Sequence, residues 1–447
     1  MQVESWFYTG MKDKLSDSTF YSSLQVMKVF KFGGASVSTV ERIKNAAKII
    51  LKYSNEKLLI VVSAMGKTTN ALEKVVEAFY NGDQQKALEL FQTIKEEHLS
   101  IVKQLQPSDE PLPAQHSLID FFTEVEWLLH DKPVRNFDYY YDQVVCIGEM
   151  PSSIVVSDYL NSVGIANKWV DVRDIIRTDD NFRDAKIDWT FTGKRVEESI
   201  LPLFEETNII LTQGFIGSTD ENESTTLGRE GSDYSAAVFA NLLNAESQTI
   251  WKDVQGVMNA DPKQYSNAQW IKELNYSEVI EMAYYGAQVI HPKTIKPLQN
   301  KHIPLYVRSF IHPDEEGTCI QSKNLTHLPP IIVYKQNQVL VELKSKDFSF
   351  VGEGLTAEVY KIFQSIKFKP NLTQSAAISL LCAVDDYSDK VQEFALKASE
   401  LFDVSVSRDL TLLTIRHYNE GIVSELIGNR TVVLRQQTPE TLQALLK

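Results

Sequence analysis

Cysteine is scarce in this sequence and no long hydrophobic run is present, and each shortage excludes a class of protein. Three cysteines, Cys146, Cys319 and Cys382, stand far apart in 447 residues, so neither a disulfide framework nor a cysteine metal site is expected. Their sparse number fits a reducing, cytoplasmic compartment. The longest apolar run, LLIVVSAM at 58–65, is far shorter than the ~20 residues of a membrane-spanning helix. We therefore expect no membrane partner.

Basic residues are also fewer than acidic residues. Lysine and arginine number 45 against 59 acidic residues, which gives a formal net charge of −14. Proteins that bind nucleic acid nonspecifically carry basic surfaces, so a nucleic-acid partner is not expected. The eight histidines show no HExxH pattern, and no metal site is predicted. The hydrophobic fraction of 43% is ordinary for globular domains.

The length of the chain and the composition of two of its segments predict how it divides into domains. A chain of 447 residues suits two or three domains. Residues 1–26 lack the apolar segment of a secretory signal, and Met27 directly precedes the first expected strand, so these residues are predicted to be an N-terminal extension. Residues 321–335 are polar, contain a double proline and are typical of a linker. The sequence thus predicts a large domain over 27–320 and a second region over 336–447.

Strands and helices alternate in the large domain. Residues 28–32 alternate like a strand, and Ser38 and Glu41 then form a capping-box pattern before an amphipathic helix. A second expected strand at 58–63 is followed by small residues and a helix from about Thr69. This rhythm predicts a three-layer α/β domain with a mostly parallel central sheet and helices on its faces. Further strands are expected at 168–172, 208–212, 248–251 and 304–308.

The expected elements become shorter after the linker. Strands at 338–344 and 377–384 alternate with helices at 355–366 and 388–401. The spacing fits two βαββ-like α+β units, of which the second is abbreviated. The remaining strands are expected near 404–407, 410–416, 431–436 and 441–446, with a short helix near 421–427.

KFGGAS at 31–36 lies where a strand turns into a helix. Paired glycines let backbone N–H groups approach phosphate oxygens, and Lys31 could neutralise charge on a transferring phosphoryl group. The alternative is a tight turn with a solvated lysine. GKT at 66–68 resembles part of a phosphate-binding P-loop, but Val61 stands where that motif needs a glycine, so we reject this interpretation.

The segment 214–232 is rich in glycine, serine, threonine and acidic residues. This composition predicts a loop that ends at Ser232, the expected N-cap of a helix over 233–243. Within it, Arg229 can hold a carboxylate through two parallel hydrogen bonds. Asp233 is either a site residue or a first-turn residue that the helix dipole favours.

Two further segments have the composition of binding loops. IGEMPSS at 147–153 places Glu149 in a loop that opens a helix, where an interaction with the helix dipole is the alternative role. WKDVQGVMNADPK at 251–263 follows a strand and is rich in turn residues. Such a loop suits nucleotide binding in an open α/β sheet, although by itself it is compatible with an ordinary turn.

Seven segments, in the order in which they occur, together resemble the aspartate kinases of the amino-acid kinase superfamily. They are KFGGASV, VVSAMGKTTN, IGEMPSS, TQGFIG, TTLGREGSDYSAA, WKDVQGVMNADP and GAQVIHPKTI. The resemblance covers about residues 28–320 and continues more weakly towards the end of the chain. It implies a carbamate kinase-like catalytic domain followed by a pair of ferredoxin-like ACT regulatory domains. It also implies that ATP, with Mg²⁺, phosphorylates the β-carboxylate of L-aspartate, the first step towards lysine, threonine and methionine.

The resemblance assigns roles to individual residues. Lys31 is expected to stabilise the transferring phosphoryl group, and Asp233 to orient Lys31 and the reacting groups. Arg229 is expected to bind the α-carboxylate of the substrate, and Glu149 its α-ammonium. The other expected substrate contacts are Ser63, Thr69 and Ser232. The expected nucleotide contacts are Lys31, Gly33, Gly34, Lys252, Asp253, Met258, Asp261, Lys263 and Gln288.

Four positions depart from the family pattern. Glu230 stands where the common RGGSD pattern has its second glycine, and an acidic side chain beside a triphosphate is unfavourable unless it points away or helps to hold magnesium. Met258 replaces a frequent tyrosine, and Lys263 a frequent arginine. Gln288 replaces a frequent lysine, which removes one positive charge. These changes bear on nucleotide binding more than on the function as a whole.

The C-terminal resemblance implies regulation by an end-product amino acid and a homodimer or higher homo-oligomer formed through the ACT domains. Segments 346–354 and 371–384 match the effector-binding elements of the family, although neither lysine nor threonine is singled out. The usual final helix is missing. The chain leaves no room for a fused homoserine dehydrogenase and contains no GxGxxG pattern, so a monofunctional enzyme is expected. The expected effector contacts are Phe348, Ser349, Gln374 and Ser375.

Two other functions stay open at this stage. One is an amino-acid kinase that acts on glutamate or a related acid, against which the IGEMPSS and LGREGSD segments argue. The other is a catalytically silent, amino-acid-binding regulator that kept the fold. Glu230 and Gln288 favour that second alternative, whereas the presence of Lys31 and Asp233 disfavours it.

Overall fold

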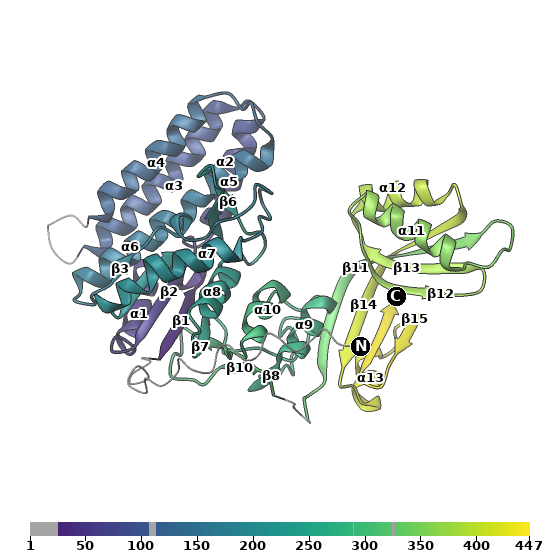
Figure 1. The fold of residues 1–447 in the computed structure, drawn as a ribbon. Coiled ribbons are helices and arrows are strands. Elements are labelled where there is room, and N and C mark those ends of the chain that lie inside the picture. The colour runs from purple at the N-terminus through teal and green to yellow at the C-terminus, as the bar shows by residue number, and fades with distance from the viewer. Residues whose placement is uncertain (1–25, 107–112, 289, 324, 326) are drawn as a thin grey trace, which may run out of the picture. The chain divides into compact units, whose positions relative to one another are not determined.

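The computed structural model describes residues 26–106, 113–288, 290–323, 325 and 327–447. These residues form two compact units (Figure 1). The first unit extends to Gly228 and includes 238–248, and the second comprises 229–237 and 249–447. The chain passes between the units within α8 (Gly231–Leu242) and β7 (Ser247–Lys252). The expected N-terminal extension, apart from Val26, lies outside the described residues. The sequence also predicts a helical segment over 84–130 with a proline-rich break at 107–113, and this break, apart from Pro113, likewise lies outside the described residues.

Parallel strands form the centre of the first unit, in the order β3-β4-β2-β1. β1 (Met27–Phe32) pairs in parallel with β2 (Lys57–Val62), and β2 pairs in parallel with β4 (Ile209–Gln213). The short strand β3 (Lys168–Trp169) adds to β4 in the same direction. Residues 58–62 of β2 are completely buried, as expected for a strand covered on both faces. The parallel sheet predicted from the sequence is therefore confirmed.

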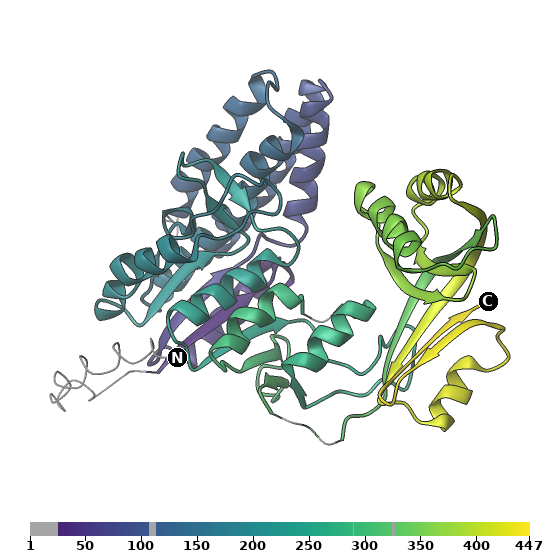
Figure 2. The same ribbon diagram turned by 45° about the vertical axis from the view of Figure 1, so that its right-hand side comes forward.

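Helices surround these strands and account for most of the first unit (Figures 1 and 2). α1 begins after Thr39, whose side chain accepts a hydrogen bond from the Arg42 backbone N–H at 3.3 Å, so the prediction of Ser38 as the cap is wrong. The long helices α3 and α4 pack side by side. The helices are α1 (Val40–Leu51), α2 (Thr68–Tyr80), α3 (Gln84–Leu105), α4 (Ala114–His130), α5 (Phe137–Val145), α6 (Glu149–Ser162) and α7 (Trp189–Arg195). Shorter helical turns are η1 (Gly34–Val37), η2 (Cys146–Gly148), η3 (Val172–Asp174), η4 (Val196–Ile200) and η5 (Pro202–Glu205).

The predicted loop at 214–232 is partly wrong. It contains a hairpin of β5 (Ile216–Ser218) and β6 (Ser224–Thr226), whose residues are buried although most are polar. The buried Asp142 of α5 accepts hydrogen bonds from the backbone N–H and the hydroxyl of Thr226, at 2.8 and 2.7 Å. A polar strand can be buried here because its partners satisfy its hydrogen bonds.

The part of the second unit before the linker continues the α/β pattern, with strand order β7-β9-β10-β8. β10 (Thr318–Gln321) is parallel to β8 (Glu273–Asn275) and antiparallel to β9 (Leu305–Ser309). Two helices, α9 (Tyr276–Tyr285) and α10 (Pro292–Asn300), lie between β8 and β9 in sequence. Gly286 follows α9 with φ 109° and gives it a left-handed C-cap that favours glycine.

The C-terminal region is an antiparallel six-stranded sheet with order β12-β13-β11-β14-β16-β15. Two long strands, β11 (Ile331–Ser345) and β14 (Phe402–Arg416), pair along their length, with register shifts around Gln338. β11 begins inside the segment expected to be the linker, because the apolar residues after the double proline join the sheet. β14 unites the strands expected at 404–407 and 410–416. The other elements are α11 (Glu353–Ser365), β12 (Pro370–Ser375), β13 (Ser379–Asp385), α12 (Ser388–Ala398), α13 (Glu420–Ile427), β15 (Val432–Gln437) and β16 (Thr441–Leu446).

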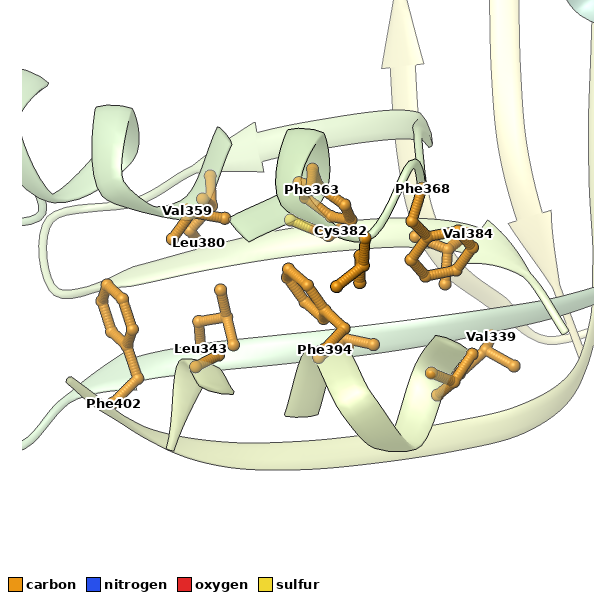
Figure 3. Close-up of a cluster of buried hydrophobic side chains, with 14 of the residues drawn as sticks. Val339, Leu343, Val359, Phe363, Phe368, Leu380, Cys382, Val384, Phe394 and Phe402 are labelled. Atoms are coloured by element: carbon orange, nitrogen blue, oxygen red, sulfur yellow. The ribbon is translucent and has the colours of Figure 1, made fainter. Parts of the chain in front are cut away.

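A buried aromatic and aliphatic cluster joins α11 and α12 to one half of this sheet (Figure 3). Phe363 of α11 and Phe394 of α12 stack with ring centroids 4.1 Å apart, and they belong to one cluster with Cys382 and its neighbours on β13. A second cluster joins α13 to β14 and β16, and it includes Ala260 from the loop after β7. Each half of the sheet thus has its own core.

Candidate functional site

Lys31 lies near the end of β1, and its ammonium group lies close to the backbone of Gly33 in the turn that follows. Lys31 is 9% exposed, and a Cβ on Gly33 would lie 3.3 Å from its Nζ. A Cβ on Gly34 would lie 2.5 Å from the Ala64 carbonyl oxygen, which real Cβ atoms do not reach. Glycine at 34 is therefore required by the close approach of two backbone segments.

The loop after β2 closes against this turn through backbone hydrogen bonds. The Ser63 N–H donates to the Phe32 carbonyl and the Gly66 N–H donates to the Gly34 carbonyl, each at 3.0 Å. Gly66 has φ 55°, a left-handed conformation that glycine adopts without strain. The half-buried side chains of Ser63 and Thr69 lie on this loop and on the first turn of α2. Two of the predicted substrate residues thus lie beside the turn of Gly33 and Gly34 that follows Lys31, which we call the lysine turn.

Glu149 is the first residue of α6 and is buried at 3% exposure. Burial raises the pKa of its carboxyl group from the ordinary 4.5 to about 8, although a hydrogen bond from the Ala64 backbone and the charge of Lys31 both lower the pKa. Its Oε2 atom has no hydrogen-bond partner among the described residues. A buried carboxyl group with a raised pKa and an oxygen free to accept a hydrogen bond is suited to binding a cationic group of a ligand, because the positive charge would favour the ionised carboxylate.

The two serines of the IGEMPSS segment hold the start of α6. The Ser152 hydroxyl donates to the Ser63 carbonyl at 2.6 Å, which ties α6 to the loop after β2. The Ser153 hydroxyl donates to the Met150 carbonyl and accepts from the Trp169 indole at 2.9 Å. The backbone at Gly148 packs closely against α2, because a Cβ at this position would lie only 3.1 Å from the Leu72 side chain. The sequence predicted a loop that opens a helix here, and the structure places Glu149 as the first residue of that helix, in a closely packed helix start.

The start of α8, in the second unit, carries the predicted substrate and catalytic residues of that unit. α8 begins at Gly231, so Ser232 lies inside the first turn and its prediction as N-cap is wrong. Asp233 is 3% exposed, and its backbone N–H donates to the Glu230 carbonyl at 3.1 Å. Arg229 is exposed. The carboxylate of Glu230 accepts the His291 backbone N–H at 2.8 Å.

A cavity of about 410 Å³ in the second unit gathers most of the predicted nucleotide residues of that unit. Its size lies within the range of small-molecule pockets. Asp253 is exposed and does not line the cavity. The predicted residues that line it are Lys252, Met258, Asp261, Lys263 and Gln288.

The loop around this cavity is held by side-chain hydrogen bonds. The Thr318 hydroxyl accepts from the Val257 N–H at 2.8 Å and donates to the Ile271 carbonyl at 2.6 Å. A Cβ on Gly256 would lie 2.6 Å from both Thr318 Oγ1 and Trp270 Nε1, so this position requires glycine. The Asn259 amide donates to the Pro330 carbonyl at 2.7 Å.

One side of the cavity, formed by the start of β11, was not predicted from the sequence. Residues Ile331–Tyr334, the first residues of β11, line it. The backbone N–H of Ile332 donates to the Asn259 carbonyl at 2.7 Å. The apolar character of 331–333 was the available signal, but it marks a buried strand without indicating what the strand contacts.

The predicted effector residues come from two turns at one end of the C-terminal sheet. The backbone N–H of Val351 donates to the Ala377 carbonyl at 2.9 Å, which brings the turn after β11 beside the β12–β13 turn. Phe348 is 72% exposed, and the Ser349 hydroxyl lies 3.0 Å from that of Ser345. Gln374 and Ser375 end β12.

Metal clusters and membrane-spanning helices are both absent from the residues that the structure describes. No group of three or more histidine, cysteine, aspartate or glutamate side chains there could hold a metal ion. No helix in the same part of the chain is long and apolar enough to cross a membrane.

Comparison with known proteins identifies the family. The model of the amino acid kinase family matches residues 27–309. Lysine-sensitive aspartokinase 3 of Escherichia coli (strain K12) is 30% identical over 397 residues, covering 87% of this chain and 86% of the relative. The chain belongs to the aspartokinases of the amino acid kinase family. Among other aspartokinases, the chloroplastic aspartokinase 2 of Arabidopsis thaliana is 30% identical over 90% of this chain and 74% of its own.

Solved aspartokinase structures share the fold. The crystal structure of E. coli aspartokinase III with aspartate and ADP matches with a TM-score of 0.79 at 28% identity, over 94% of this chain and 96% of that chain. The same enzyme with lysine and aspartate gives a TM-score of 0.77, over 94% and 95% of the two chains. The recognition of an aspartokinase from seven sequence segments is therefore confirmed.

Proposed function

We propose that this chain is an aspartate kinase, which transfers the γ-phosphoryl group of ATP to the β-carboxylate of L-aspartate and forms 4-phospho-L-aspartate and ADP. The observation that supports this proposal within the family is the buried carboxyl group of Glu149. Burial raises its pKa although the charge of Lys31 lowers it in part, and its Oε2 atom has no hydrogen-bond donor in the part of the chain that the structure describes. An amino-acid substrate supplies the cation that such a group lacks.

The chemistry needs no general base, because an aspartate side chain with a pKa of about 3.9 is already ionised at neutral pH. One β-carboxylate oxygen bonds to the γ-phosphorus while the bond from that phosphorus to the bridging oxygen of ADP breaks. Positioning and charge stabilisation dominate such a transfer. Lys31 stabilises the transferring group, Glu149 binds the α-ammonium, and Arg229 binds the α-carboxylate. Asp233 orients the reacting groups.

The cavity in the second unit is proposed to hold the nucleotide. Lys252 and Lys263 supply positive charge at its lining, and Gly256 lets the loop close tightly. Mg²⁺ is proposed to accompany ATP and to neutralise charge on the β- and γ-phosphates. It fits a chain without a cluster of protein ligands in its described part, because Mg²⁺ in kinases is held largely by substrate phosphates and water.

The C-terminal region, 336–447, is proposed to be a pair of ACT-type regulatory units that bind an amino-acid effector and dimerise. Phe348 and Phe350 support an interface there, because both aromatic side chains are largely exposed, at 72% and 79%. The relative from E. coli is named for its sensitivity to lysine. A cytoplasmic location fits the three free cysteines, of which Cys146 and Cys382 are buried.

The decisive test is ATP-dependent formation of acyl phosphate from L-aspartate, trapped with hydroxylamine. We expect product from the wild type, and its loss in Lys31→Ala and in Asp233→Ala. L-Glutamate and D-aspartate in place of L-aspartate are expected to give little product. Absence of product from folded, ATP-binding wild type would contradict the proposal and favour a silent regulator, whereas preference for glutamate would favour a different amino-acid kinase.

A further inference from the structure

Glu230 occupies a backbone position that suits glycine. Its φ is 54°, in the left-handed region that disfavours a side chain, and the family pattern has glycine there. An interaction made by the side chain can offset this backbone cost. The side chain is half-buried and makes one.

The carboxylate of Glu230 binds the N-terminus of α10. Its Oε2 accepts the backbone N–H of His291 at 2.8 Å. His291 is the N-cap of α10, and its own Nδ1 accepts the Lys293 N–H at 3.2 Å. A carboxylate at a helix N-terminus is favoured by the helix dipole, and its hydrogen bonds are stronger than those of neutral acceptors.

The backbone of the same residue closes the start of α8. The Glu230 carbonyl accepts the N–H groups of Asp233 and Tyr234, both at 3.1 Å. A separate contact joins the same two helix ends, since the Lys293 ammonium lies 5.1 Å from the centroid of the Tyr234 ring. Glu230 therefore connects the first turn of α8, with Ser232 and Asp233, to the first turn of α10.

The segment that leads into α10 reaches the nucleotide cavity. Gly286, Ala287 and Gln288 line the cavity, and His291 lies three residues after Gln288. One end of this short segment is thus part of the cavity wall, and the other is bound to Glu230. All of these residues belong to the second unit.

We propose that Glu230 is a positioning residue, which replaces the glycine of the family pattern and, through its hydrogen bond to His291, fixes the start of α10 and thereby the cavity-lining residues Gly286, Ala287 and Gln288 relative to the first turn of α8. It acts through the His291 N–H. The proposal rests on the proposed function, because the cavity is assigned to the nucleotide there. It also explains how an acidic residue is accommodated at this position.

The test compares Glu230→Gly, Glu230→Ala and Glu230→Gln in the full chain. Glycine suits the left-handed backbone, so Glu230→Gly is expected to fold with a Tm close to that of the wild type. We expect the Kd for ADP and the KM for ATP to rise about ten-fold in the glycine and alanine variants, with a smaller change in the KM for aspartate. Glutamine keeps an acceptor of the same length, so Glu230→Gln is expected to recover most of the affinity.

Hydrogen exchange gives a readout that does not depend on catalysis. Amide exchange in a peptide covering 286–294 is expected to accelerate in the glycine and alanine variants and to stay near the wild-type rate in Glu230→Gln. Glu316→Gln is the matched control, because that side chain is 79% exposed in its pair with Lys272. Unchanged ADP binding and unchanged exchange in Glu230→Gly would overturn the proposal. If the wild type makes no acyl phosphate, the kinase proposal fails, and ADP titration with exchange still decides the role of Glu230.

Discussion

Arg416 and Glu278 form a buried, two-point ion pair in the second unit. Arg416 Nε donates to Glu278 Oε1 at 2.6 Å, and Nη2 donates to Oε2 at 2.9 Å. The two residues are only 8% and 4% exposed. The pair joins the end of β14 to α9, whose C-cap Gly286 begins the cavity-lining segment. Because two parallel hydrogen bonds set orientation as well as distance, this pair holds the C-terminal sheet against α9 of the same unit.

Removal of Arg416 is expected to be strongly destabilising. Arg416→Ala leaves the Glu278 charge buried without its main partner, which costs about 3–5 kcal/mol in the free energy of unfolding. Urea denaturation followed by circular dichroism measures the loss. Lys361→Ala is the control, because its pair with Glu358 is exposed and contributes at most about 1 kcal/mol. Equal losses in the two variants would contradict the buried pair.

Glu149 is expected to make the stability of the ligand-free protein depend on pH. Its pKa is about 8 in the folded state against an ordinary 4.5, so the folded state binds this proton more tightly than the unfolded chain does. Its contribution is therefore fully present below pH 4.5 and is lost as the pH rises through 8, with a slope of at most about 1.4 kcal/mol per pH unit.

The variant Glu149→Gln cannot ionise and is expected to lack this dependence. Thermal unfolding of both proteins between about pH 5.5 and 8.5 measures it, and the Tm of the wild type should fall relative to that of the variant as the pH rises. A difference in Tm that stays constant over this range would show that the carboxyl group has an ordinary pKa.

Gly34→Ala is expected to disable the lysine turn. The added methyl group would meet the Ala64 carbonyl at 2.5 Å and the Gly66 carbonyl at 3.0 Å, so one of the two loops must move. Displacement of Lys31 by even about 1 Å is expected to lower kcat by about 100-fold. Gly352→Ala is the control, since a Cβ there meets nothing within 4 Å. Wild-type kcat in Gly34→Ala would remove the turn from the catalytic assignment.

Gly256→Ala is expected to affect nucleotide binding selectively. Its methyl group would collide with Thr318 Oγ1 and Trp270 Nε1, which hold the loop around the cavity. We expect the KM for ATP to rise about ten-fold, with little change in the KM for aspartate. Steady-state kinetics with each substrate varied in turn separate the two constants, and Gly354→Ala, which adds a methyl group in open space, serves as the control. Equal increases in both constants would argue for a general folding defect.

Local patterns were enough to predict the main strands of the parallel sheet and the turn that follows β1. Strand β2 follows directly from its apolar run, and the glycines at 33 and 34 mark the turn that follows the strand carrying Lys31. Helix α5 was missed because five aromatic and acidic residues at its start, FDYYY, carry little helical signal. The hairpin β5–β6 was missed because its residues are polar, and only the hydrogen bonds of Asp142 explain their burial.

The sequence by itself determined the family, the main strands and helices of the parallel sheet and the charged residues beside its turns, because these depend on local periodicity and on side-chain chemistry. Tertiary structure alone decided three properties. It raised the pKa of Glu149 by removing water from its carboxyl group, and it made Ile331–Tyr334 a wall of the cavity that we propose for the nucleotide. It also directed Glu230 to the His291 N–H. Each depends on contacts between segments distant in sequence, and burial and hydrogen-bond geometry across such contacts are set only when the chain has folded.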